Sequence, residues 1–477
     1  MGTGTHDDIA WMPATEMAQA VRDRRLSPVE VTDALLARIE ALNPALNAYC
    51  LVTPEMARAQ AKAAEAAVMR GDALGPLHGV PLSIKDLFDV QGLPTTKGSK
   101  IYRDRIAEGY EFSAKRLLDA GGVHLGKTNT PEFGMLPTTE NLLFGATYNP
   151  WDLRRTPGGS SGGAASAVAA GLGPLALGSD GGGSIRIPAS LCGIFGLKPT
   201  YGRVPRNPGG WSTITHRGPM TRTVADAALM LDVIAGHEPS DPYSVADYPG
   251  SFLAEVERGV RGLRVGWSPD LGYARVGAEV RAICERAALR FSELGCTVEE
   301  APLRLENPSA DGTFMTLAAT HDAIWLGELT PEQLAQTGDA ANAFLDYGRK
   351  VSGADYVRAQ HRRMALWSEM QRFHETYDLL LTPALSVTAF PVGEPPAKVG
   401  DVDFPPFGWS PFTVPFNMTG QPAASVPCGF DAQGLPVGLQ IVGRAYEDAM
   451  VLRAARAFEQ IAPWADRRPT AIAPLLA

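Results

Sequence analysis

The 477-residue chain lacks the segments that mark secreted and membrane-spanning proteins. It has no run of 18 apolar residues that could cross a bilayer, so we expect no membrane association. The N-terminus has neither a basic region nor an apolar region, and a secretory signal is not expected. The five cysteines are widely spaced and form no C-x-x-C pair, which is typical of reduced thiols in a cytoplasmic protein.

The sequence also has few of the features that hold metals, cofactors or nucleic acids. It contains no H-x-x-x-H pattern and no cluster of cysteine and histidine, so we expect no metal. No G-x-x-x-x-G-K-[ST] run is present to cradle a phosphate, and we expect no cofactor. The net charge of −9, without a basic stripe, argues against a nucleic-acid partner.

The composition is that of a globular protein with a large core, since 45% of the residues are hydrophobic and 20% are charged. Length alone would suggest about three domains. No low-complexity linker and no internal repeat divides the chain, however. We therefore predict a single domain over residues 1–477.

Helical and strand patterns alternate along the chain. Residues 14–70 are predicted to be helical, with a capping box at Ser27 and a helix that ends at Asn43-Pro44. Further helices are predicted at 111–120, 224–236, 277–294 and 448–460, and strands at 79–86, 123–127, 263–267, 377–383 and 435–443. This alternation predicts an α/β fold with helices on both faces of a sheet.

The most informative segment is Thr156–Thr200, in which two Gly/Ser turns flank small apolar residues. The turns, 158–163 and 178–184, each open onto a segment that can be helical. Free N–H groups at the start of a helix bind anions or a developing oxyanion. Ser160 and Ser184 lie beside such donors, and this is the arrangement that acyl transfer needs.

Other interpretations of this segment are less favoured. A flexible linker has a similar Gly/Ser content, but here the glycines alternate with apolar residues that can pack. Gly158, Ser160 and Gly162 match the G-x-S-x-G nucleophile elbow, yet that elbow follows a buried strand and the preceding residues are polar. None of the histidines has a distinctive acidic neighbour in the sequence, so a Ser–His–Asp triad is not favoured either.

The strand predicted at 79–86 carries a lysine, Lys85, in a short apolar pattern. One interpretation is an exposed lysine on an edge strand, where lysine discourages aggregation. The other is a buried lysine whose pKa falls toward neutrality and which acts as the base for the serines. The presence of Ser160 and Ser184 favours the second interpretation.

Two segments are candidates for the wall of a substrate pocket. The aromatic and proline-rich segment 404–416 could be plain core or pocket wall, and the sequence leaves both open. The connection 132–145 could also line a site. From position alone we predict a mobile lid over 203–218 and pocket walls at Met135, Leu136, Trp211, Ile214 and Phe416.

Five segments together resemble the amidase signature family of serine hydrolases. They are GVPLSIKDLFDV (79–90), GKTNTPEF (126–133), NPWDLRRTPGGSSGGAASAVAAG (149–171), LGSDGGGSIRIPASLCGIFGLKPTYGR (177–203) and GLPVGLQIVGR (434–444). The resemblance implies one large α/β domain around a mixed, mostly parallel sheet. It also implies a signature core at 77–220 and a variable, substrate-shaping region at 300–420.

The same resemblance implies a Ser–cisSer–Lys triad. Lys85 would be the base, Ser160 the bridging serine in a cis peptide, and Ser184 the nucleophile. Backbone N–H groups would hold the oxyanion, and three further residues would support the site. The implied donors are Gly181, Gly182, Gly183 and Ser184, and the supporting residues are Asp180, Arg186 and Ser161. Many family members have threonine in place of Gly181, so this chain should have a looser oxyanion loop or a wider pocket.

We therefore expect a free-standing amidohydrolase that cleaves amides of bulky, apolar or aryl compounds, with esters, carbamates and lactam oligomers as further candidate substrates. One alternative is the glutaminase component of a tRNA-dependent amidotransferase, its A subunit. Such proteins usually carry an S-S-L-D-Q-type run, whose acidic residue is absent from 211–218 here. Another alternative is a non-catalytic scaffold with the same fold. The family also suggests a homodimer.

Overall fold

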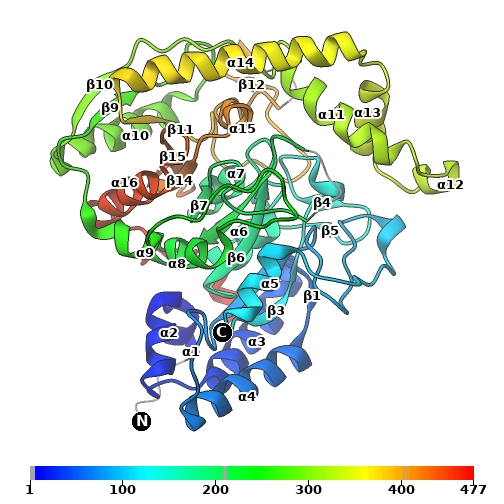
Figure 1. Ribbon diagram of the computed structural model, residues 1–477, viewed down its shortest axis with the longest axis vertical. Helices are drawn as coiled ribbons and strands as arrows, with labels where there is room; N and C mark the ends of the chain where they lie inside the picture. The colour runs from blue at the N-terminus through cyan, green and yellow to red at the C-terminus, as the bar shows by residue number, and fades with distance from the viewer. Residues whose placement is uncertain (1–5, 208–211, 401, 405–406, 477) are drawn as a thin grey trace.

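The computed structural model describes residues 6–207, 212–400, 402–404 and 407–476, and an eleven-stranded sheet runs through its centre (Figure 1). The strand order is β1-β3-β2-β6-β8-β7-β14-β15-β11-β9-β10. These strands are β1 (Tyr49–Val52), β2 (Pro81–Lys85), β3 (Val123–Thr128), β6 (Leu175–Asp180), β7 (Phe195–Lys198), β8 (His216–Thr221), β9 (Arg264–Trp267), β10 (Thr297–Glu300), β11 (Leu379–Pro383), β14 (Ala423–Phe430) and β15 (Pro436–Val442). Two small hairpins lie outside the sheet, β4 (Glu140–Asn141) with β5 (Gly145–Ala146) and β12 (Lys398–Val399) with β13 (Val402–Asp403).

The sheet is mixed, as predicted. Strands β3, β2 and β6 run parallel to one another, and so do β11, β9 and β10. The strands between these two groups pair antiparallel, and β1 adds an antiparallel edge. The carboxyl ends of β2 and β6 therefore lie next to each other, inside the sheet.

Helices surround this sheet (Figure 1). Four of them, drawn in blue, lie at one end of the molecule, and a long helix drawn in yellow crosses the opposite end. The helices are α1 (His6–Trp11), α2 (Ala14–Arg22), α3 (Pro28–Leu46), α4 (Pro54–Arg70), α5 (Phe112–Asp119), α6 (Gly162–Ala169), α7 (Arg186–Cys192), α8 (Val224–Ile234), α9 (Phe252–Glu255), α10 (Ala278–Leu289), α11 (Thr313–Leu326), α12 (Pro331–Leu334), α13 (Asp339–Gly348), α14 (Gly353–Thr376), α15 (Val414–Thr419) and α16 (Asp448–Ile461). None of the described helices is both long and apolar enough to cross a membrane.

Strand β6 shows how the two faces of the sheet are covered. Successive side chains of a strand point to opposite faces. Leu175 and Leu177 belong to the large core that also contains residues of α8 and α16. Ala176, between them, belongs to a separate cluster with residues of α6 and α7. The predicted α/β fold with helices on both faces is confirmed.

The first long helix, α3, begins where the sequence predicts but ends later than predicted. Ser27 Oγ accepts from the N–H groups of Val29 and Glu30, at 3.0 and 3.4 Å, which caps the N-terminus as expected. The helix continues through Pro44 to Leu46, so the prediction that it ends at Asn43-Pro44 is wrong. The end comes at Asn47, which adopts the left-handed conformation that commonly terminates helices.

Lys85 lies at the end of an interior strand. Strand β2 is paired on one side with β3 and on the other with β6, and all five of its residues are buried. The interpretation of Lys85 as an exposed edge-strand lysine is therefore wrong. The strand has a neighbour on each side, and the Lys85 side chain is fully buried.

The core of the sheet should respond strongly to a loss of volume. Leu439 in β15 is fully buried, and we expect Leu439→Ala to lower the free energy of unfolding by about 2–5 kcal/mol, because the cavity left behind cannot close. The measurement is urea denaturation followed by circular dichroism. Leu289→Ala is the matched control, since Leu289 is 53% exposed and its truncation should cost much less. Equal losses in the two variants would contradict the assignment of the core.

Candidate active site

Two neighbouring strands bring a lysine and a serine to one end of the sheet. Lys85 is the last residue of β2, and Ser179 is the penultimate residue of β6. Because these strands are parallel, their carboxyl ends lie side by side. This is the edge at which open α/β sheets bind ligands. The loop that precedes α6 adds Ser160 and Ser161.

Lys85 is fully buried, and its Nζ lies within hydrogen-bond distance of three hydroxyl groups. These are Ser160 Oγ at 2.6 Å, Ser161 Oγ at 3.0 Å and Ser179 Oγ at 3.0 Å. Burial lowers the pKa of Lys85 well below its usual value, and the charge of Asp180 opposes this only in part. A lysine with a lowered pKa supplies a neutral amine, which is a base.

The loop that carries Ser160 has the geometry implied by the resemblance, because the Gly159–Ser160 peptide bond is cis. Thr139 holds the loop from outside by donating to the Gly158 carbonyl oxygen at 2.8 Å. A Cβ on Gly159 would lie 2.3 Å from the Thr138 carbonyl oxygen, so no larger residue fits at this position. Thr139 was not predicted as a site residue, although it lies in the connection 132–145.

Ser184 faces the same cavity as Ser160. Its carbonyl oxygen accepts from the N–H of Ser161 at 3.1 Å, which links the two Gly/Ser turns. In the part of the chain that the structure describes, no hydrogen bond joins the Ser160 and Ser184 hydroxyl groups directly. Hydrogen bonds of this kind often tighten only when the substrate is bound.

The predicted oxyanion donors are not equivalent. Gly183 is already engaged, because its N–H donates to Asp180 Oδ1 at 2.7 Å, and its inclusion among the donors is corrected here. Gly181, Gly182 and Ser184 line the cavity, so their N–H groups are the candidate donors. The turn itself is fixed by its carbonyl groups; that of Gly182, for example, accepts from Thr413 Oγ1 at 2.7 Å.

A fully buried ion pair anchors the turn that carries Ser184. Arg186 donates to both carboxylate oxygens of Asp180, at 3.0 and 2.9 Å, as well as to Gln440 Oε1 at 2.8 Å and Asn417 Oδ1 at 2.6 Å. Burial by itself raises the pKa of Asp180, but the charge and hydrogen bonds of Arg186 outweigh it and hold this pKa well below its usual range. The ions are fully paired, which is the condition under which buried charges are tolerated.

The serines open onto a cavity of about 280 Å³. Most of its wall is apolar, with contributions from several separate parts of the chain. The apolar lining includes Leu87, Phe133, Met135, Leu136, Ile214 and Phe314. Three of the predicted pocket residues, Met135, Leu136 and Ile214, are therefore in the wall.

Two other pocket predictions have different outcomes. Phe416 is fully buried in a core cluster with Phe412 and Leu380, and it does not line the cavity, so this prediction is corrected. It belongs to α15, whose six residues are all buried, so its ring packs into the core. Trp211 lies outside the described residues.

The segments with two open interpretations are resolved in part. Within 404–416, Trp409, Phe412 and Phe416 are core residues, whereas Phe407, Ser410 and Val414 line the cavity, so the segment is both core and wall. The predicted lid at 203–218 overlaps β8, because its last three residues, 216–218, are paired in the sheet. The lid can therefore not include them. Residues 208–211 lie outside the described part of the chain.

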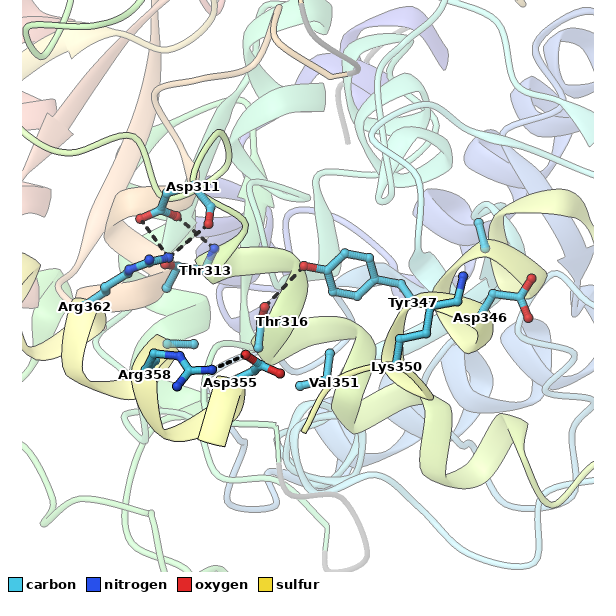
Figure 2. A pocket seen from close by; sticks show the side chains of 12 residues that line it. Asp311, Thr313, Thr316, Asp346, Tyr347, Lys350, Val351, Asp355, Arg358 and Arg362 are labelled. Carbon is cyan, nitrogen blue, oxygen red and sulfur yellow. Dashed lines mark hydrogen bonds and ion pairs between the residues drawn. The ribbon is translucent and has the colours of Figure 1, made fainter. Parts of the chain in front are cut away.

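A larger cleft of about 540 Å³ lies between α11, α13 and α14 (Figure 2). Its charged side chains mostly pair with one another; Asp355 accepts from Arg358 at 2.5 Å, and Arg362 donates to the Asp311 carbonyl oxygen at 3.0 Å. No serine is among the described residues that line it. Among the described residues, no group of three or more His, Cys, Asp or Glu could hold a metal ion. We assign the active site to the smaller cavity.

Comparisons with known proteins show what this chain is similar to. The Amidase family model matches residues 30–452. An acylamidase from Rhodococcus erythropolis is 43% identical over 98% of both chains. The A subunit of the glutamyl-tRNA(Gln) amidotransferase from Moorella thermoacetica is 39% identical, over 97% of this chain and 99% of that protein. The crystal structure of a bacterial aryl acylamidase of the amidase signature family superposes with a TM-score of 0.91, at 32% identity, over 96% of this chain and 97% of that one.

The buried ion pair should be needed for both stability and activity. We expect Arg186→Met to lower the free energy of unfolding by about 3–5 kcal/mol, because it leaves Asp180 charged and unpaired in the interior. Activity should fall as well, since Asp180 also fixes the turn before Ser184. Urea denaturation and steady-state kinetics measure the two effects.

Arg58→Met is the control for that variant, because Arg58 pairs with Asp33 at an exposed site. The exposed pair should contribute only about 0–1 kcal/mol. A loss at Arg186 as small as the loss at Arg58 would contradict the anchoring role.

Proposed function

The chain belongs to the Amidase family and is an amide-cleaving hydrolase. We propose that it cleaves amides with bulky apolar or aryl groups. In this proposal it acts without a partner protein and forms an acyl-enzyme on Ser184. Esters and carbamates of similar shape are further candidate substrates, because they react through the same intermediate. The observation that carries the proposal is the fully buried Lys85 amine, which lies 2.6 Å from Ser160 Oγ, together with a cavity that both Ser160 and Ser184 line.

In the proposed mechanism the neutral Lys85 amine takes the proton of Ser160 while Ser160 Oγ takes the proton of Ser184. Ser184 Oγ then attacks the carbonyl carbon of the amide. The N–H groups of Gly181, Gly182 and Ser184 stabilise the resulting oxyanion. The proton returns through Ser160 to the leaving amine, so the C–N bond breaks and the acyl group remains on Ser184. Water enters by the same route and releases the acid.

The shape of the cavity supports an apolar substrate. Its volume of about 280 Å³ is close to the lower end of the range of small-molecule sites, about 300–1,000 Å³. Rings from Phe133, Phe314 and Phe344 line it together with aliphatic side chains. The names of two relatives, an acylamidase and an aryl acylamidase, are compatible with such a substrate.

A second candidate function is that of a glutaminase component of an amidotransferase, which the similarity to the Moorella thermoacetica protein favours. Glutamine carries an α-carboxylate, and the described residues that line the cavity include no lysine or arginine to pair with it. The mostly apolar wall fits it less well than an aryl group. The two functions differ in substrate and in the need for a partner, and both differences can be measured.

A substrate panel separates these functions. The substrates are p-nitroacetanilide, p-nitrophenyl butyrate, an aryl carbamate and glutamine. We expect wild type to hydrolyse aryl substrates, and we expect Ser184→Ala to lower their kcat/KM by at least about 10³-fold, because the nucleophile is lost. Ser309→Ala is the matched control, since Ser309 lines the same cavity away from Lys85. Turnover of glutamine alone, or no turnover without an added partner, would contradict the proposal.

The dependence of activity on pH tests the role of Lys85. The base works only when neutral, so kcat/KM should rise with pH through the lowered pKa of Lys85 and level off well below the usual lysine value. Lys85→Arg stays charged at every accessible pH and should lose about 10²–10⁴-fold in kcat/KM. Activity that is independent of pH, or retained in Lys85→Arg, would contradict this role.

The same lowered pKa makes a prediction for stability. The pKa of Lys85 is lower in the folded protein than in the unfolded chain. At pH values between these two pKa values the unfolded chain binds more protons than the folded protein. In this pH window the contribution of Lys85 therefore makes the protein more stable as the pH rises. Lys85→Met should remove this contribution and should be more stable than wild type below the window. Urea denaturation at several pH values measures the difference, and Lys62→Met, at an exposed position of α4, is the control.

A further inference from the structure

One part of the wall of the catalytic cavity carries titratable side chains. Helix α11 contributes Phe314, Met315, Ala318, His321 and Asp322 to the wall, at a spacing that places all of them on one face of the helix. Among the described lining residues, His321 and Asp322 are the titratable ones. The remainder of the wall is apolar side chains, backbone and small hydroxyl groups.

Asp322 has no cationic partner in the part of the chain that the structure describes. Its one hydrogen bond is from the neutral Trp325 Nε1 to Oδ1, at 3.3 Å. Burial raises the pKa of Asp322 to about 6, which the Trp325 hydrogen bond opposes. The neighbouring His321 does not supply a positive charge, because burial and then the charge of Arg206 lower its pKa. At pH 8 the part of the wall formed by His321 and Asp322 therefore carries one uncompensated negative charge.

The carboxylate is held in place by the packing around it. Trp325 meets the ring of Phe133 edge to face, with the ring centroids 4.7 Å apart. Phe133 and Phe344 are themselves in the cavity wall, and both pack on the cluster formed by Leu326, Ala341 and Leu345 between α11 and α13. Asp322 thus belongs to a packed part of the wall, and none of the described residues that line the cavity is a lysine or an arginine.

We propose that Asp322 is a specificity-determining residue that binds a cationic amine of the substrate, at a distance from the bond that is cleaved. A substrate ammonium would give the carboxylate the charge-assisted hydrogen bond that the protein does not provide. A substrate with only apolar groups would leave the carboxylate unpaired in an apolar cavity, at a cost in binding. This inference rests on the proposed function, and it adds a polar group to the class of bulky apolar or aryl amides.

Two matched substrate pairs test the proposal at pH 8. In the first pair the charge is on the acyl side: 5-aminopentanoyl p-nitroanilide is compared with hexanoyl p-nitroanilide, which replaces the ammonium by a methyl group. In the second pair the charge is on the leaving group: the acetyl amide of 4-(aminomethyl)aniline is compared with that of 4-ethylaniline. For wild type we expect kcat/KM to favour the charged member of one pair by roughly 10- to 100-fold.

Two variants locate the origin of that preference. Asp322→Asn keeps the shape of the side chain and removes its charge. We expect it to reduce the preference to within about threefold, by lowering kcat/KM for the charged members and raising it for the neutral members, which no longer leave a carboxylate unpaired. Glu328→Gln removes an exposed carboxylate just beyond α11 and should keep the full preference. Activity on the neutral members also shows that each variant is folded.

The outcomes distinguish this proposal from the one on which it rests. Hydrolysis of the neutral members without a preference for the charged member of either pair would overturn the role of Asp322 and leave the proposed function intact. A preference that persists in Asp322→Asn would also overturn it. Failure of wild type to hydrolyse all four compounds would contradict the proposed function itself, and the role of Asp322 would fall with it.

Discussion

The burial of Lys85 without a carboxylate partner is the constraint on which the active site depends. An ammonium group in that position would be costly, since three hydroxyl groups cannot neutralise it. The protein therefore favours the neutral amine. Two sheet neighbours for β2 are needed to exclude water from the lysine, and the adjacent strand β6 supplies Ser179 and leads directly into the turn before Ser184.

Two buried ion pairs close to the site contrast with Lys85. Asp86 follows Lys85 in the sequence, but its carboxylate accepts from Lys127 at 2.9 Å and so does not compensate Lys85. Arg186 is likewise matched by Asp180. These paired ions fix backbone turns. In the part of the chain that the structure describes, Lys85 has no such ion pair, so burial lowers its pKa and its amine can act as a base. Perturbed titration of this kind is typical of catalytic groups.

The sequence predicted the fold class and the residues that gather at the site, because both depend on local signals. Alternation identifies β2, and the Gly/Ser turns identify the segments that carry Ser160 and Ser184. Contacts between distant segments were not predictable in this way. Thr139 and Asn417 support the site from positions that no motif marks, and Gln440 supports it from the distant segment 434–444; only the folded chain brings them together.

The errors in the predictions have a related cause. Phe416 was predicted in the pocket wall from position alone, but its ring packs in the core cluster with Phe412 and Leu380. Gly183 was counted as a donor because it lies in the turn, yet the Asp180 carboxylate reaches its N–H first. In both cases the sequence identified the right segment, but it did not show which way a single group in that segment points.

The cavity wall is divided between two parts of the molecule that can change independently. The reacting groups come from β2, β6 and the turns that follow the parallel strands, whereas much of the wall that meets the far side of a substrate comes from α11. Helix α11 packs with α13 around a small core of its own, at the periphery of the molecule (Figure 1). Substitutions there can alter what enters the cavity at little cost to the chemistry. Such a division lets one hydrolytic mechanism acquire new substrates during evolution without being rebuilt.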